Sequence, residues 1–139
     1  YKDGLMDGLV ETWYLNGNKR SITHYKNDKI VGHDIQYYKN QNVRYNINYN
    51  QEGDRDGEAL WYDKSGNLLA KGIYKDDNPW NGSFINYGIW IEYKNGVPVL
   101  AKRLKSNSVI SFEEAAESIE KSMKKSKGSY FYLEEDSDI

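Results

Sequence analysis

The sequence contains no cysteine among its 139 residues, so disulfide bonds and thiolate zinc sites are excluded. It also has no apolar run near the roughly 18 residues that suggest a membrane-spanning helix, and we expect no transmembrane segment. The 19 Lys and Arg residues nearly balance the 21 Asp and Glu residues, and the basic residues form no stripe. Because phosphate-driven binding needs clustered cations, we expect no nucleic-acid partner.

The sequence also lacks the residue patterns that are typical of catalysis. His24 and His33 have no third ligand at a spacing that suits a metal ion. The acidic stretch 52–56 loosely imitates a calcium loop, but a turn between two repeats explains it better. No nucleophile is accompanied by a base. We therefore predict a protein that is not an enzyme, with no catalytic residues, no metal site and no cofactor.

A repeat of 24 to 25 residues organises most of the chain. Glycines and tyrosines recur with this period, and an aromatic pair follows each of the first three glycines. The glycines are Gly8, Gly32, Gly57 and Gly82, and the tyrosines are Tyr1, Tyr25, Tyr49 and Tyr74. Self-similarity at a fixed period of this length indicates a stacked array of one supersecondary unit.

Each unit is predicted to be a β-hairpin. Residues typical of turns follow the first three glycines at a distance of eight or nine positions; they are Asn16-Gly17, Asn40-Gln41 and Ser65-Gly66. The fourth unit is shorter, and we expect its turn near residues 86–88. A terminal repeat is usually atypical because it must end the array.

The aromatic pairs predict two ladders of rings. Adjacent side chains on a strand point to opposite faces, so the two members of each pair should lie on opposite sides of the sheet. One predicted ladder is Trp13, Tyr37 and Trp61. The other is Tyr14, Tyr38 and Tyr62, reinforced on the second strands by Tyr25, Tyr49 and Tyr74. We expect these rings to hold the sheet together, and the three aromatic pairs together with Trp90 to supply a candidate binding face.

The repeated glycines admit two structural interpretations. A ring from the next unit that lies across the backbone would collide with any β-carbon, and we expect this close approach at Gly8, Gly32, Gly57 and Gly82. The alternative is a positive φ angle at a bulge or turn. Both interpretations stay open at the level of the sequence.

The whole recurring pattern resembles the MORN repeat (membrane occupation and recognition nexus). It consists of a glycine, an aromatic pair, Asn-Gly, and Tyr-Lys-Asn-Gly before the next glycine. The resemblance covers residues 1–96 and is strongest to the bacterial variant of the repeat, which is common in proteins labelled as antitoxins. It implies an elongated, twisted antiparallel sheet of stacked hairpins, and for activity only a scaffold or an interaction surface.

The first residues match the closing half of a unit, because Tyr1 precedes Gly8 by the same seven positions as Tyr25 precedes Gly32. The chain also begins without a methionine. We therefore expect an upstream segment to precede it: a signal peptide, a further repeat or both. On this basis an extracytoplasmic location is favoured over a cytoplasmic one, although the absence of cysteine fits both.

A different composition follows the array. Ser111 and Glu114 match a capping box, which predicts the start of a helix. We expect this helix to end at Gly128 and to cover the end or one face of the sheet, with docking on a partner as the alternative. Its predicted apolar face consists of Phe112, Ala116, Ile119 and Met123.

We thus predict a mainly β fold with three parts. Residues 1–100 form the hairpin array, residues 101–128 a linker and the C-terminal capping helix, and residues 129–139 a short edge strand or an acidic tail. The predicted function is that of a bacterial module that binds another protein, with a toxin-neutralising or immunity role as its specific form. Carbohydrate or cell-envelope binding by the aromatic ladders is the alternative, and exposed sheet edges favour self-association.

Overall fold

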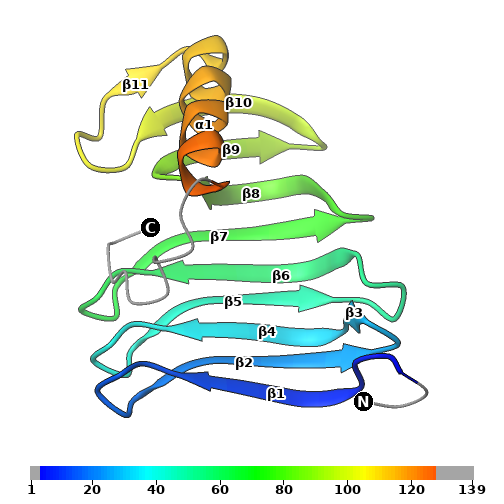
Figure 1. The fold of residues 1–139 in the computed structure, drawn as a ribbon. Coiled ribbons are helices and arrows are strands. Elements are labelled where there is room, and N and C mark those ends of the chain that lie inside the picture. Colours follow the sequence, from blue (N-terminus) through cyan, green and yellow to red (C-terminus); the bar gives the residue numbers. More distant parts are fainter. Residues whose placement is uncertain (1–3, 128–139) are drawn as a thin grey trace.

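The computed structural model describes residues 4–127 of the chain. Within this range eleven antiparallel strands form one open sheet, and one helix follows them (Figure 1). The predicted mainly β fold with one C-terminal helix is therefore confirmed. The strands are β1 (Gly8–Trp13), β2 (Lys19–Lys26), β3 (Lys29–Ile30), β4 (Gly32–Tyr37), β5 (Val43–Tyr49), β6 (Arg55–Tyr62), β7 (Leu68–Lys75), β8 (Asn78–Asn86), β9 (Ile89–Lys94), β10 (Val97–Arg103) and β11 (Val109–Ile110), and the helix is α1 (Phe112–Lys127).

Strands that are neighbours in the sequence are also neighbours in the sheet. The order runs from β1 and β2 through β4 to β11, and the short β3 pairs with β2 beside this path. In each of the four hairpins the repeated glycine lies opposite a tyrosine of the return strand. The pairs are Gly8 with Tyr25, Gly32 with Tyr49, Gly57 with Tyr74, and Gly82 with Tyr93. The hairpins therefore share one register, although the fourth is shorter.

The turns within the first three hairpins confirm the predicted turn residues. Their third loop residue is left-handed, with φ angles of 89° at Gly17, 79° at Gln41 and 90° at Gly66. This geometry is that of a type I turn followed by a left-handed residue. The fourth hairpin turns in two residues instead, because Tyr87 and Gly88 both have positive φ, as a type I′ turn requires.

The repeated glycines are left-handed, so the alternative interpretation is right and the expected ring contact is wrong. Their φ angles are 95° at Gly8, 70° at Gly32, 86° at Gly57 and 96° at Gly82. A β-carbon on Gly8 or Gly32 would meet nothing within 4 Å, and one on Gly82 would meet backbone atoms instead of a ring. The period therefore marks a backbone angle that other residues rarely adopt.

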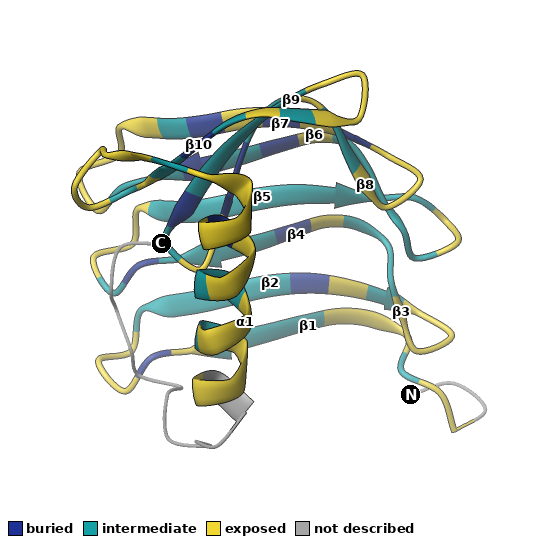
Figure 2. Ribbon diagram, turned by 90° about the horizontal axis from the view of Figure 1, so that it is seen from above, coloured by how far each residue is buried: buried dark blue, intermediate teal, exposed yellow. Residues whose placement is uncertain are grey.

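The helix distinguishes the two faces of the sheet. Ala115 of α1 is buried together with Ile89 of β9 and Ala101 of β10, and we call the face on which α1 packs the inner face. Because side chains alternate along a strand, Ile91 lies on the same face as Ile89, and Phe84, which pairs with Ile91, lies there too. By the same alternation, the repeated glycines and the tyrosines opposite them also belong to the inner face. The opposite side is the outer face. Figure 2 shows that buried residues lie mainly within strands, whereas the turns and most of α1 are exposed.

The aromatic pair of the third hairpin is displaced by one position relative to the first two. Trp13 and Tyr37 follow their glycines by five positions, whereas Trp61 follows by four and Tyr62 by five. A displacement of one residue moves a side chain to the other face. The register shift that precedes Trp13 and Tyr37 likewise precedes Tyr62. Trp61 therefore lies on the inner face and Tyr62 on the outer face, so both predicted ladders are wrong in their third member.

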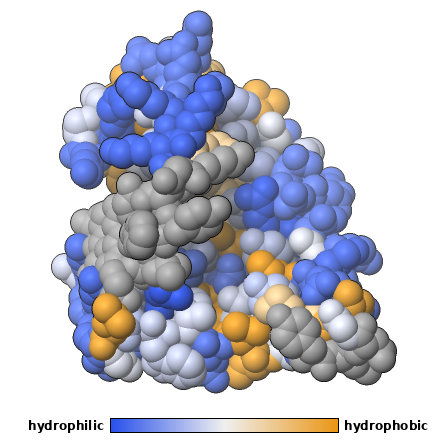
Figure 3. All heavy atoms as spheres, in the orientation of Figure 1, coloured by the Kyte–Doolittle hydropathy of each residue, from blue (hydrophilic) through white to orange (hydrophobic). Residues whose placement is uncertain are grey.

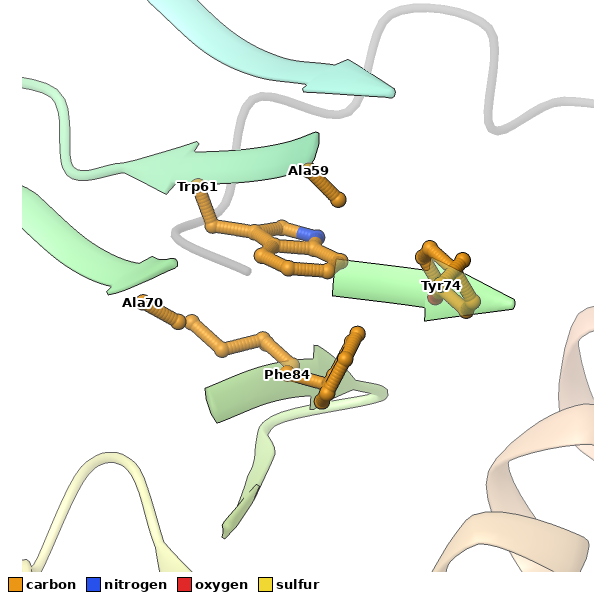
Figure 4. Close-up of a cluster of buried hydrophobic side chains, with 6 residues drawn as sticks. Ala59, Trp61, Ala70, Tyr74 and Phe84 are labelled. Carbon is orange, nitrogen blue, oxygen red and sulfur yellow. The ribbon is translucent and has the colours of Figure 1, made fainter. Parts of the chain in front are cut away.

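The inner face carries a ring cluster at the third and fourth hairpins (Figure 4). The Phe84 ring makes edge-to-face contacts with three others, and the centroid distances are 5.8 Å to Trp61, 4.9 Å to Tyr74 and 5.6 Å to Tyr93. Such contacts contribute roughly 0.5 to 1.5 kcal/mol each beyond the burial of area. Ala59 and Ala70 are buried beside these rings, whereas Ile85, the residue after Phe84, is buried on the outer face opposite Trp90.

The expected approach of a ring to a glycine occurs at a position that the period does not mark. A β-carbon on Gly72 of β7 would lie 2.4 Å from the Cζ atom of Phe84. No real β-carbon comes so close to a ring, so Gly72 is required by the packing of Phe84.

Hydrogen bonds tie the turns of the first three hairpins to one another. The Tyr14 hydroxyl donates to the Tyr37 carbonyl at 2.6 Å, and the Tyr38 hydroxyl donates to the Tyr62 carbonyl at 2.7 Å. Asparagine amides add four more bonds, from Asn16 and Asn18 to the carbonyl of Lys39 and from Asn40 and Asn42 to that of Lys64. We call these bonds the turn ladder. Tyr14 and Tyr38 thus link hairpins through their hydroxyls, where stacking of rings was predicted.

The turn ladder ends at the third hairpin, where Asp63 takes the place of Tyr14 and Tyr38. Its carboxylate accepts the N–H groups of Ser65 and Asn67 at 2.9 Å, within its own turn. These backbone hydrogen bonds hold the pKa of Asp63 below its usual value. A carboxylate cannot donate, and the fourth hairpin has no three-residue turn to receive a bond.

The start of α1 agrees with the capping box, because the Glu114 N–H donates to Ser111 Oγ at 3.0 Å. The helix packs against β9 and β10 on the inner face, as expected of a helix that covers one face of the sheet (Figure 1). The predicted stop at Gly128 and the predicted strand or tail over 129–139 lie outside the described residues.

The predicted apolar face of α1 is only partly right. Ile119 packs toward the sheet, but Phe112 and Met123 are 44% and 42% exposed, and Ala116 is exposed as well. Ala115, which was not predicted, is buried in their place. The helix rests on its Ala115 side because a small residue lets it approach Ile89 and Ala101 closely.

Candidate binding surfaces

The seven aromatic residues predicted as a binding face occupy three environments. Three are buried on the inner face and present no surface to a partner: Tyr14, Tyr38 and Trp61. Trp90 is half-buried on β9, with the Lys102 ammonium 4.4 Å from its ring centroid. The remaining three, Trp13, Tyr37 and Tyr62, lie together on the outer face.

Trp13, Tyr37 and Tyr62 form what we call the outer aromatic row. Trp13 is 53% exposed, and the other two side chains are half-buried. They take the same register position in three successive hairpins, so consecutive rings are two strands apart, or roughly 9.5 Å. Leu68, which lies opposite Tyr62 and is also 53% exposed, extends this apolar surface.

A polar pocket of about 230 Å³ lies elsewhere on the outer face. His33 Nδ1 is 2.9 Å from Asn46 Oδ1, and the Asn48 amide donates to the Asp56 carbonyl at 2.9 Å. Amide, imidazole and carboxylate groups could here receive a partner's polar groups. The residues that line the polar pocket are His33, Asn46, Asn48, Glu58 and Leu60.

The N-terminal half of the inner face buries polar side chains. Figure 3 views the molecule from this side, and its visible hydrophobic surface is broken into separate patches between hydrophilic residues. Asp34 and Thr23 are buried at the second and first hairpins, where the Thr23 hydroxyl donates to the carboxylate at 2.9 Å. Burial raises the pKa of Asp34, and the hydrogen bond from Thr23 opposes this rise. Burial likewise raises the pKa of the neighbouring Tyr45 phenol.

A second pocket, of about 490 Å³, lies where the β7–β8 and β9–β10 turns come together. Its walls include two half-buried rings, Trp80 and Tyr93. We call it the ring pocket, and it is lined by Lys75, Asp76, Asn78, Pro79, Trp80, Tyr93 and Gly96.

Trp80 and Tyr93 were not among the residues predicted to bind a partner. One signal was present, because Trp80 stands two positions before Gly82, where the preceding unit has Arg55 before Gly57. The pocket lies where the Asn95-Gly96 turn packs against Trp80. The Gly96 N–H donates to the Trp80 carbonyl at 2.9 Å, as the Asp77 N–H does to the Arg55 carbonyl in the third hairpin.

Within residues 4–127, no group of three His, Asp or Glu side chains is arranged to hold a metal ion. His24 and His33 are exposed on neighbouring strands, and His24 Nδ1 lies 3.4 Å from the His33 carbonyl oxygen. In the same part of the chain, no helix combines the length and the apolar character needed to cross a membrane.

Comparison with protein families agrees with this geometry. Two segments, residues 6–27 and 55–76, match the model of the MORN repeat variant. The matched segments are the first and third hairpins, each taken from two residues before its glycine to two residues after its tyrosine. The hairpin between them has the same register without a match of its own. Searches of curated proteins and of solved structures find no match.

Proposed function

We propose that this protein is a non-catalytic module that binds another protein through its outer aromatic row. The observation that carries the proposal is the placement of Trp13, Tyr37 and Tyr62 at one register position of the outer face. These three rings are not part of the core, because the aromatic residues of the core lie on the inner face. Large rings on a continuous rigid sheet are the side chains that concentrate interface energy. MORN repeats are generally associated with binding modules, which agrees with this role.

The surroundings of the row favour a protein partner. Leu68 extends the apolar surface, and the polar pocket supplies hydrogen-bonding groups on the same face. An apolar centre with polar groups beside it is the usual composition of a protein interface. The bacterial toxin-neutralising or immunity role is the narrower form of this proposal, and a captured partner that inhibits growth would support it.

Affinity capture from a lysate of the host tests the proposal. The bait is the purified protein, compared with a variant that carries Trp13→Ala, Tyr37→Ala and Tyr62→Ala. Tyr87→Ala is the matched control, because Tyr87 is 46% exposed in the β8–β9 turn, away from the row. Circular dichroism and thermal unfolding first establish that all three proteins are folded.

We expect one protein to be retained by the wild type and by Tyr87→Ala and lost from the triple variant. With the purified partner, the triple variant should bind at least about a hundredfold more weakly, since truncation of one hot-spot ring costs about 2 kcal/mol. Retention of no protein across a range of salt concentrations would contradict the proposal. Equal retention by the triple variant would place binding on another surface.

Carbohydrate binding is the second candidate, and the spacing of the row favours it. Rings that recur every two strands, roughly 9.5 Å apart, could stack on alternate sugars of an extended glycan. The amide, imidazole and carboxylate groups of the polar pocket could bond sugar hydroxyls. Pull-down on peptidoglycan and on insoluble glycans, with no other protein present, separates the two candidates. Retention that the triple variant loses would favour the carbohydrate candidate.

A further inference from the structure

Cations of the chain lie over several aromatic rings of the inner face. Three tyrosines of the array have a cation from their own chain over the ring. Lys39 lies 5.9 Å from the ring centroid of Tyr14, and Arg44 and Arg55 lie 4.7 Å from those of Tyr38 and Tyr74. A cation over an aromatic face is attracted by the ring quadrupole. Pairing of tyrosine with a cation is therefore a recurring feature of this sheet.

The third hairpin shows the most complete form of this pairing. Arg55 lies over Tyr74, its Nη1 atom is 3.4 Å from the Tyr74 hydroxyl, and its Nε atom is 2.7 Å from Asp77 Oδ1. The guanidinium thus stacks on a ring and pairs with a carboxylate of the adjacent turn. Both contacts suit its planar, charged group.

In the fourth hairpin Trp80 stands where Arg55 stands in the third. The main-chain carbonyl of Arg55 accepts the N–H of Asp77, and that of Trp80 accepts the N–H of Gly96. The Trp80 indole packs against Gly96, where a β-carbon would lie 3.0 Å from Cζ3. Among the described residues no cation lies over Tyr93, whose ring lines the pocket together with the Asp76 turn. The fourth hairpin therefore has the tyrosine without the arginine, and the acidic residue beside the pocket, Asp76, comes from the β7–β8 turn.

The pocket already holds a cation at its other ring. Lys75 Nζ lies 4.5 Å from the centroid of the Trp80 ring, and the side chain is otherwise exposed. Tryptophan is the aromatic side chain that binds cations best. An ammonium group is strongly hydrated, whereas a guanidinium is weakly hydrated and stacks on aromatic faces. A guanidinium should therefore displace Lys75 from this position.

We propose that the ring pocket binds the arginine side chain of a partner protein. The planar guanidinium lies between Trp80 and Tyr93, and the Asp76 carboxylate at the rim accepts its N–H groups. Lys75 is the competing cation that must move aside. This site is separate from the outer aromatic row and deepens the proposed protein-binding function by naming the side chain that a partner supplies.

Three short peptides test the proposal: acetyl-Gly-Xaa-Gly-amide with arginine, lysine or citrulline at the central position. Citrulline keeps the planar shape of arginine without its charge, and lysine keeps the charge without the plane. Binding is followed by NMR shifts of the Trp80 indole N–H and of backbone amides near residue 93. We expect the arginine peptide to bind about three- to tenfold more tightly than either of the others, the range that cation–π contacts provide.

Variants of the pocket sharpen the test. Lys75→Gln should bind the arginine peptide more tightly than the wild type, because the competing cation is removed. Trp80→Leu and Tyr93→Leu should reduce binding at least threefold, and Tyr87→Leu is the exposed control. Lys75 is exposed, so the Lys75→Gln protein should fold normally and keep the test decisive even if a ring variant does not fold.

Equal binding of all three peptides, or shifts elsewhere on the protein, would overturn the proposal. So would an absence of shifts in Lys75→Gln, or similar shifts with a neutral oligosaccharide. The triple variant of the outer aromatic row should bind the arginine peptide normally. If the wild type captures a protein but does not bind the arginine peptide, this inference alone is refuted. If it binds the arginine peptide but captures no protein, only the function proposed for the row is refuted.

Discussion

The N-terminal and C-terminal hairpins are built from one repeat but are stabilised in different ways. The first and second hairpins carry Thr23 and Asp34 at the centre of the inner face, and the turn ladder ties their ends together. The third and fourth hairpins bury Trp61 and Phe84 at the corresponding part of the sheet, and α1 covers the strands that follow. A repeated backbone can therefore keep its register while its stabilising interactions change from polar to apolar.

This difference explains why one residue replaces another at equivalent positions. Tyr14 and Tyr38 have a following turn to which a hydroxyl can donate, whereas Asp63 has none and bonds its own turn. Arg55 stacks on Tyr74, while Trp80 packs against Gly96 and lines a pocket. Position in the array, and not only the repeat, decides what each side chain does.

The largest effect should come from the C-terminal ring cluster. Phe84→Ala removes a ring that touches three others and fills the space over Gly72. We expect the free energy of unfolding in urea to fall by about 3 to 5 kcal/mol, the usual cost of truncating a buried phenylalanine. A loss below about 1 kcal/mol would mean that the cluster is not the core of this region.

A smaller effect is expected in the turn ladder. Tyr38→Phe keeps the buried ring but removes the hydroxyl that donates to the Tyr62 carbonyl at 2.7 Å. The loss should be about 1 kcal/mol, because a net hydrogen bond contributes that much. The exposed Tyr87→Phe is the matched control and should change stability by no more than about 0.5 kcal/mol. Equal losses in the two variants would show that the ladder contributes nothing.

Two aspartates should respond to pH with opposite signs. The pKa of Asp34 is raised mainly by burial, so the carboxyl favours the fold below its unfolded pKa and loses this contribution as pH rises through its folded pKa. Asp34→Asn should therefore be more stable than the wild type at pH 7, and the two should converge toward about pH 4. Urea unfolding at several pH values measures the difference.

Asp77 provides the contrast for this experiment. Its pKa is lowered mainly by the hydrogen bond from Arg55, so its contribution is present above the unfolded pKa and is lost as pH falls through the folded pKa. Asp77→Asn should thus be less stable than the wild type at pH 7, with the difference vanishing in acid. The same pH dependence for both variants would contradict the assigned causes.

The sequence predicts the architecture well because period and turn chemistry are local properties. The turns at Gly17 and Gly66 and the helix cap at Ser111 all appear where the residues place them. The third aromatic pair was misplaced because its distance from Gly57 is one residue shorter, and such a shift reverses the faces without changing the appearance of the repeat. A count from each glycine would have found it.

Other features could not be derived from the sequence because they depend on contacts between distant elements. Gly72 is fixed by the ring of Phe84 twelve residues later. The orientation of α1 follows from the small residues Ala101 and Ala115 at its contact with the sheet. The ring pocket follows from the way in which the Gly96 turn meets Trp80. In each case the sequence pattern predicts the strand, turn or helix, and the packing between elements determines which of its side chains make the contact.

One paired measurement tests most directly whether the aromatic residues divide by face into core and binding surface. The free energies of unfolding of Trp61→Ala and Trp13→Ala are compared under the same conditions. Trp61 is 3% exposed and Trp13 is 53% exposed, so we predict a loss of about 3 to 5 kcal/mol for the first and less than about 1 kcal/mol for the second. Equal losses, or a larger loss for Trp13→Ala, would contradict the division.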